Sequence, residues 1–73
     1  MLLKTFRNYE DDYFYYVIFE AVTGAKKGQF NLHIYSKQFG TQEVNNFYPN
    51  VVDAEAVIFQ HSREAHDKSD VQQ

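Results

Sequence analysis

The segment from Tyr13 to Val22 constrains the fold most, because Tyr, Phe, Val and Ile make up nearly all of it. These side chains favour an extended backbone. In a helix, neighbouring aromatic residues beside Val17 and Ile18 would crowd one another at χ1. A strand is therefore expected here, and a helix capped by Asp11 or Asp12 is the competing interpretation. Both sides of the strand are apolar, so both faces of its sheet need a cover.

Other strands are expected on either side of this segment. Leu2–Tyr9 alternates in polarity and carries charges on both sides, which favours an edge strand. Thr41–Tyr48 is a weaker strand that ends at Pro49. In the segment between them, alternation places one set of residues on the core and the other in solvent: Phe30, Leu32 and Ile34 against Asn31, His33, Tyr35 and Lys37.

Two signals mark a turn and a helix. The glycines at both ends of Gly24–Gly28 predict a hairpin turn with Lys26 and Lys27 at its tip. Asp53 is the expected N-cap of a helix over Ala54–Asp67, which contains no Gly or Pro.

The resulting prediction is a single α+β domain over residues 1–67, followed by a frayed tail over residues 68–73. Its antiparallel sheet has three or four strands packed against one C-terminal helix, in the order βββα or ββββα. Seventy-three residues leave room for only one core, and the absence of cysteine excludes disulfides. Aromatic burial or self-association must supply the stability, and the sequence leaves the strand order open.

The expected helix has one face for the sheet and one large residue outside that face. At about 100° per residue, five positions share one arc: Ala54, Val57, Ile58, His61 and Ala65. Phe59 lies outside it, beside Arg63. Either Phe59 folds over a sheet edge or under the tail, or it contacts another chain.

The Tyr13–Val22 strand poses the same question for the sheet. Its uncharged side is expected to face the core, namely Tyr13, Tyr15, Val17, Phe19 and Ala21. The other side is then an aromatic patch beside His33 and Tyr35, made of Phe14, Tyr16, Ile18 and Glu20. Either the first strand or the Phe39–Tyr48 segment covers this patch, or the patch is an interface.

No pattern of reactive residues predicts a catalytic, cofactor or metal site. Ser62, His66 and Asp70 would share a helix stripe, but an exposed helix end supplies neither oxyanion donors nor a dry pocket. The three histidines lack the spacing of a helical metal site, since His61 and His66 are five positions apart. The acidic run of residues 10–12 lacks the glycine of a calcium loop. The Gly24–Gly28 turn lacks the phosphate-loop spacing.

The surplus apolar surface without reactive residues predicts a non-catalytic protein-binding module that acts alone or as a homodimer. The expected contact residues are Phe14, Tyr16, Ile18, Lys26, Lys27, Tyr35, Phe59 and Arg63. Small acidic, aromatic-rich proteins of this kind are common among phage and mobile-element products that inhibit host DNA-processing or defence enzymes. The net charge of −3 gives no general attraction for phosphate backbones. Met1–Arg7 lacks the apolar core of a signal peptide and Tyr13–Phe19 is too short to span a bilayer, so a cytoplasmic location without membrane contact is expected.

Two other functions stay open. A single-stranded nucleic-acid binder would stack bases on sheet aromatics and contact phosphates with basic side chains; the residues would be Phe14, Tyr16 and Tyr35 with Arg7, Lys26, Lys27 and Lys37. A small enzyme, or a regulatory subunit of one, would form its active site across an oligomer interface with His33 or His61.

Overall fold

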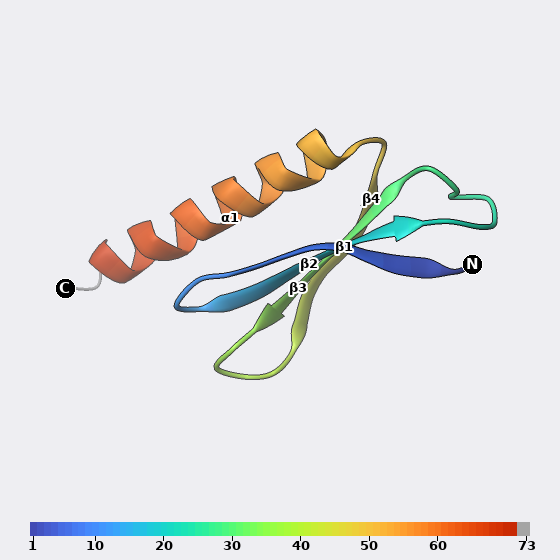
Figure 1. The fold of residues 1–73 in the computed structure, drawn as a ribbon. Coiled ribbons are helices and arrows are strands. Elements are labelled where there is room, and N and C mark those ends of the chain that lie inside the picture. Colours follow the sequence, from blue (N-terminus) through green and yellow to red (C-terminus); the bar gives the residue numbers. More distant parts are fainter. Residues whose placement is uncertain (72–73) are drawn as a thin grey trace.

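The chain folds into a four-stranded antiparallel sheet with one helix at its C-terminal end, which confirms the expected ββββα arrangement. A computed structural model describes the backbone of residues 1–71 and the side chains of residues 1–68. The elements are β1 (Leu3–Glu10), β2 (Phe14–Ala21), β3 (Phe30–Ser36), β4 (Gln42–Tyr48) and α1 (Val51–Val71). Figure 1 shows α1 running along one side of the twisted sheet.

The strands pair in chain order, β1-β2-β3-β4, so every connection between two strands is a hairpin. β1 is an edge strand, as its charges predict. Its register against β2 shifts between Thr5 and Arg7, which is a β-bulge at Phe6. The other edge is β4, which pairs regularly with β3 from Val44↔Ile34 to Tyr48↔Phe30.

The predicted turn between β2 and β3 is present. Gly24 and Gly28 both have positive φ values, 85° and 88°, which residues with a Cβ rarely adopt. The Gly28 amide donates to the Ala21 carbonyl at 2.9 Å and so closes the hairpin.

The helix begins earlier than its sequence predicts and extends further. Asn50, not Asp53, is the N-cap: its Oδ1 accepts a hydrogen bond from the Asp53 amide at 2.9 Å. Asp53 lies within the first turn, where its negative charge interacts favourably with the helix dipole. At the other end α1 continues past Asp67 to Val71. Residues 72 and 73 of the predicted frayed tail lie outside the described residues.

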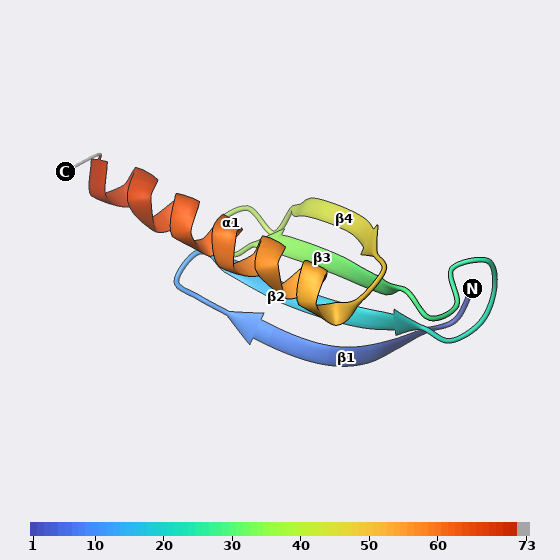
Figure 2. The same ribbon diagram turned by 90° about the horizontal axis from the view of Figure 1, so that it is seen from above.

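The core lies between α1 and one face of the sheet, which we call the helix face. α1 crosses β2, β3 and β4 (Figure 2). The buried hydrophobic cluster contains Tyr16, Ile18, Leu32 and Ile34 from the sheet and Ala54 and Ile58 from the helix. The predicted sheet-facing arc of the helix is thus correct for its buried residues. Each fully buried large side chain contributes roughly 1.5–3 kcal/mol of transfer free energy.

Candidate functional site

The structure reverses the predicted faces of β2. Tyr16 and Ile18 are 1% and 0% exposed and lie on the helix face, and Phe14 packs against the same core. These three residues were expected on the outside, so that assignment is wrong. The expectation relied on the charge of Glu20 to mark the solvent side. Glu20 instead lies in the last row of the β2–β3 pairing, opposite Phe30, where it is only partly buried.

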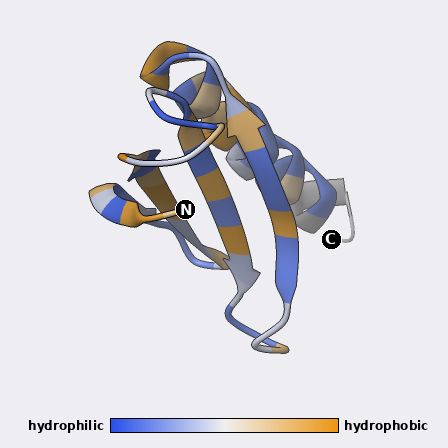
Figure 3. Ribbon diagram, turned by 90° about the vertical axis from the view of Figure 1, so that its right-hand side faces the viewer, coloured by the Kyte–Doolittle hydropathy of each residue, from blue (hydrophilic) through white to orange (hydrophobic). Residues whose placement is uncertain are grey.

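The face of the sheet away from α1, which we call the open face, is the aromatic surface that needs a cover. Cross-strand pairing places its residues in adjacent rows: Tyr15, Val17, Phe19, Asn31, His33, Tyr35, Asn45 and Phe47. Tyr15 is 49% exposed and the other aromatic residues of this face are half-buried. Figure 3 shows bands of hydrophobic and hydrophilic residues along the strands. Tyr35 lies on this face, as the alternation along β3 predicted, but the β2 aromatic residues expected beside it, Phe14 and Tyr16, lie on the helix face.

A chain of side-chain hydrogen bonds crosses the open face. Asn31 is 2% exposed, and its Nδ2 donates to Asn45 Oδ1 at 2.9 Å and to the Asn46 carbonyl at 3.0 Å. Asn31 Oδ1 therefore accepts from His33 Nε2 at 2.6 Å. His33 Nδ1 accepts from the Tyr35 hydroxyl at 2.9 Å. Burial lowers the pKa of His33, in agreement with this neutral tautomer.

Two lysines flank the aromatic rings of the open face. Lys26 Nζ lies 5.3 Å from the centre of the Phe47 ring, and Lys37 Nζ lies 4.8 Å from the centre of the Tyr15 ring. Both distances are within the range of a cation–π interaction. Lys37 also donates to Glu10 Oε2 at 2.6 Å. Each end of the open face thus presents a cation over an aromatic ring.

The negative charge of the protein is concentrated in α1. The helix contains five acidic and two basic residues, whereas the first fifty residues contain five of each. The net charge of −3 therefore belongs to the helix sequence, and the sheet and its turns are neutral as a group. The total charge of the protein therefore does not describe the charge around the open face.

Phe59 and Arg63 lie on the opposite side of the molecule from the open face. Phe59 is 61% exposed on α1, so it does not fold over a sheet edge. Arg63 is also exposed, and both line a shallow hollow with Ala56. One flat partner surface cannot reach these residues and the open face together, because the sheet and helix lie between them. A contact role for Phe59 and Arg63 stays a prediction.

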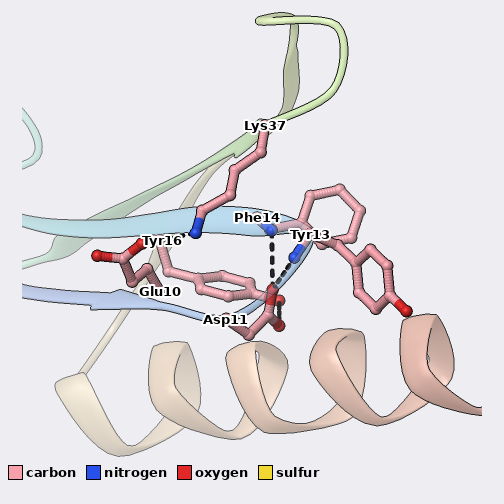
Figure 4. A network of polar contacts seen from close by, with 6 residues as sticks. All are labelled: Glu10, Asp11, Tyr13, Phe14, Tyr16 and Lys37. Atoms are coloured by element: carbon pink, nitrogen blue, oxygen red, sulfur yellow. Dashed lines mark hydrogen bonds and ion pairs between the residues drawn. The ribbon is translucent and has the colours of Figure 1, made fainter.

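Asp11 lies in the β1–β2 turn near α1 (Figure 4), and it joins this turn to the helix through Ser62. Its Oδ1 accepts from the amides of Tyr13 and Phe14, each at 2.8 Å. Its Oδ2 accepts from the hydroxyls of Tyr16 at 2.8 Å and Ser62 at 2.7 Å. Burial acts to raise the pKa of Asp11, but these hydrogen bonds outweigh it and lower the pKa to about 2. The carboxylate is fully used as an acceptor, which indicates a structural role.

A second link between sheet and helix lies on β1. Glu55 of α1 accepts a hydrogen bond from the Tyr9 hydroxyl, and its Oε1 lies 2.9 Å from Arg7 Nη1. The Tyr9 hydrogen bond, helped by the charge of Arg7, lowers the pKa of Glu55. Arg7 was a candidate phosphate contact, but it is on the helix side and is paired within the chain.

A hollow of about 460 Å³ lies at the end of the sheet, between the β1–β2 turn, the β3–β4 turn and the last turns of α1. Its walls include Phe14 and Ala65, with Phe39 and Lys68 exposed at the rim. The sequence gives no sign of this hollow, because segments far apart in the chain form it.

The candidate catalytic residues have separate partners. Ser62 donates to Asp11, and the ring of His66 packs edge-on against Tyr13 at a centroid distance of 5.4 Å. Asp70, the third member of that predicted stripe, has a side chain outside the described part of the chain. The other helical histidine, His61, packs edge-on against Phe14. Among the described residues, no cluster of three or more His, Asp or Glu could hold a metal ion.

Comparisons with protein-family models, with curated proteins and with solved structures find no match to this chain. Across the described residues, no helix has both the length and the apolar character needed to cross a membrane.

Proposed function

We propose that this chain is a non-catalytic protein-binding module that contacts its partner through the open face of the sheet. The observation that carries the proposal is an aromatic sheet face that no element of the described chain covers, made of Tyr15, Phe19, Tyr35 and Phe47. Tyr and Phe supply large contact areas at low cost in side-chain entropy. The hydrogen-bonded polar groups beneath them leave few unsatisfied atoms for a partner to bury.

In its narrower form, the proposal is that the chain is a phage or mobile-element product that inhibits a host DNA-processing or defence enzyme in the cytoplasm. Small size, acidity and the absence of cysteine support this form. Lys26 and Lys27 at the tip of the β2–β3 turn are exposed beside the open face, where they suit an acidic rim on the partner.

The test compares Tyr15→Ser with Phe59→Ser, since both residues are exposed and lie on opposite sides of the molecule. Each variant is immobilised and used to capture proteins from a nuclease-treated cell extract. Wild type and Phe59→Ser are expected to retain the same protein, and Tyr15→Ser is expected to lose it. Retention by Tyr15→Ser together with loss by Phe59→Ser would move the binding site to the helix and refute the proposal.

A second candidate, single-stranded nucleic-acid binding, is supported by the lysines above the open-face rings. Its stacking residues would be Tyr15, Phe19 and Phe47, because Tyr16 and Phe14 are packed against the helix. Titration of a labelled oligonucleotide at low and high salt separates the two functions. Binding that weakens steeply with salt and is lost in Lys26→Gln would favour nucleic acid, whereas a flat titration at low salt would exclude it.

A further inference from the structure

The two edges of the sheet are protected to different degrees. β1 has the features that natural proteins use to prevent strand addition: a bulge at Phe6, and the cations Lys4 and Arg7. β4 has neither Lys nor Arg nor Pro, and its only charged residue, Glu43, lies at the register shift near its start. The stretch Val44–Tyr48 is therefore a regular, uncharged outer edge.

The backbone of this stretch has a defined orientation. The Asn46 carbonyl points toward β3, where it accepts a hydrogen bond from Asn31 Nδ2 at 3.0 Å. Peptide groups alternate in direction along a strand. The N–H and C=O groups of Asn45 and Phe47 consequently point away from β3, along the outer edge of the sheet.

We propose that β4 pairs with β4 of a second copy of this chain, antiparallel and centred on Asn46. In this register Asn45 faces Phe47 of the second copy, and each exchanges N–H and C=O hydrogen bonds with the other, on both sides of the centre. The outward groups are the ones that this pairing requires. A centre on Asn45 would keep this hydrogen-bonding pattern but place Val44 opposite Asn46, so the side chains select the centre.

The side chains fit the same register. Val44 faces Tyr48 of the second copy on the helix side of the joined sheet, as a β-branched and aromatic pair of the kind that stabilises sheets. Both residues are half-buried in the single chain and so have surface left to bury. No two like charges meet, because Val44–Tyr48 carries none.

The pairing also sets the shape of the dimer. An antiparallel edge contact has its two-fold axis perpendicular to the sheet, so both helices lie on one side and both open faces on the other. The dimer would present one continuous aromatic surface with the two Phe47 rings near its centre. This inference does not depend on the proposed function, since it concerns the strand edge and not the sheet face.

The first test uses the two-fold symmetry of the contact. Asn46 would lie opposite itself, so Asn46→Lys and Asn46→Glu each bring like charges together, while a mixture of the two brings opposite charges together. Solution mass is measured by light scattering over a wide range of concentrations. Wild type is expected to dimerise with concentration, each variant to dimerise at least about tenfold more weakly, and the mixture to regain the dimer. Asn8→Lys, an exposed asparagine on β1, is the matched control and is expected to dimerise like wild type.

The second test reads the edge directly by amide hydrogen exchange. Exchange at Asn45 and Phe47 is expected to slow as protein concentration rises, while exchange at Asn46 does not change. A wild type that is monomeric at every concentration, or a dimer that is equally stable in Asn46→Lys, would overturn the proposal. So would the absence of a dimer in the mixed variants, provided that circular dichroism shows both variants folded.

Discussion

Replacing Asp11 by Asn should destabilise the protein in a manner that depends on pH. Asp11 accepts four hydrogen bonds, from two backbone amides and from the hydroxyls of Tyr16 and Ser62. Asparagine keeps the shape but removes the charge, so the variant resembles the protonated form of the wild type. The change therefore measures how much the ionised carboxylate contributes to the folded state.

The magnitude follows from the pKa. In the folded state the pKa of Asp11 falls from 3.8 to about 2. Each pKa unit corresponds to about 1.4 kcal/mol, so the ionised form stabilises the fold by about 2 kcal/mol at neutral pH. Because the folded pKa is the lower one, this contribution is complete above pH 4 or so and disappears as the pH falls through about 2.

The assay is denaturant unfolding of wild type and Asp11→Asn from pH 7 to pH 2. At pH 7 the variant is expected to be less stable by about 2 kcal/mol, or roughly 10 °C in Tm for a domain of this size. The difference should shrink toward zero at pH 2. Asp12→Asn, a change to the exposed neighbouring carboxylate, is the control and should stay within about 0.5 kcal/mol of wild type. Equal stability at pH 7, or a difference that does not change with pH, would refute the structural role of the Asp11 charge.

Two further predictions concern the core and the open face. Ile58→Ala should lower the unfolding free energy by about 2–5 kcal/mol, because Ile58 is 3% exposed. Phe59→Ala, one position later, should stay within about 0.5 kcal/mol of wild type. Similar losses at both sites would contradict this placement of the helix. His33 should titrate below the usual histidine pKa of 6.5 and carry its proton on Nε2 at pH 7, as measured by the ¹⁵N NMR shifts of its ring. Asn31→Ala removes the hydrogen-bond partner of Nε2 and should change these ring shifts. An unchanged spectrum would disprove the hydrogen-bonded chain.

Local sequence patterns predicted most of the fold because each element has its own signal. β-branched and aromatic density marks β2, strict alternation marks β3, and the glycines mark the β2–β3 turn. The helix arc was also predictable, since a period of 3.6 residues places Ala54 and Ile58 on one side. The missed N-cap has a simple cause: Asn50 directly follows Pro49, and the stronger acidic signal of Asp53 lies within the first turn.

The candidate surface was harder to predict, because β2 is apolar on both sides and offers no alternation. A single charged residue, Glu20, then decided the assignment, and its position at the end of the sheet made it misleading. The polar residues of β3 indicate the faces of the sheet more reliably than Glu20 does. Asn31, His33 and Tyr35 share one side of a strand whose other side contains the fully buried Leu32 and Ile34, so pairing β2 to β3 would have identified the open face.

The hydrogen-bonded chain on the open face supports the proposed binding function. A reactive histidine needs an accessible nitrogen, but both ring nitrogens of His33 are bonded within the sheet, to Asn31 and Tyr35. The same bonds hold the Tyr35 ring in place, so a partner that covers it pays little additional side-chain entropy. They also satisfy the buried Asn31 before any partner arrives, which removes a desolvation cost from association. A face built in this way has polar groups that position its aromatic rings, and in the proposed function these rings are the contact surface.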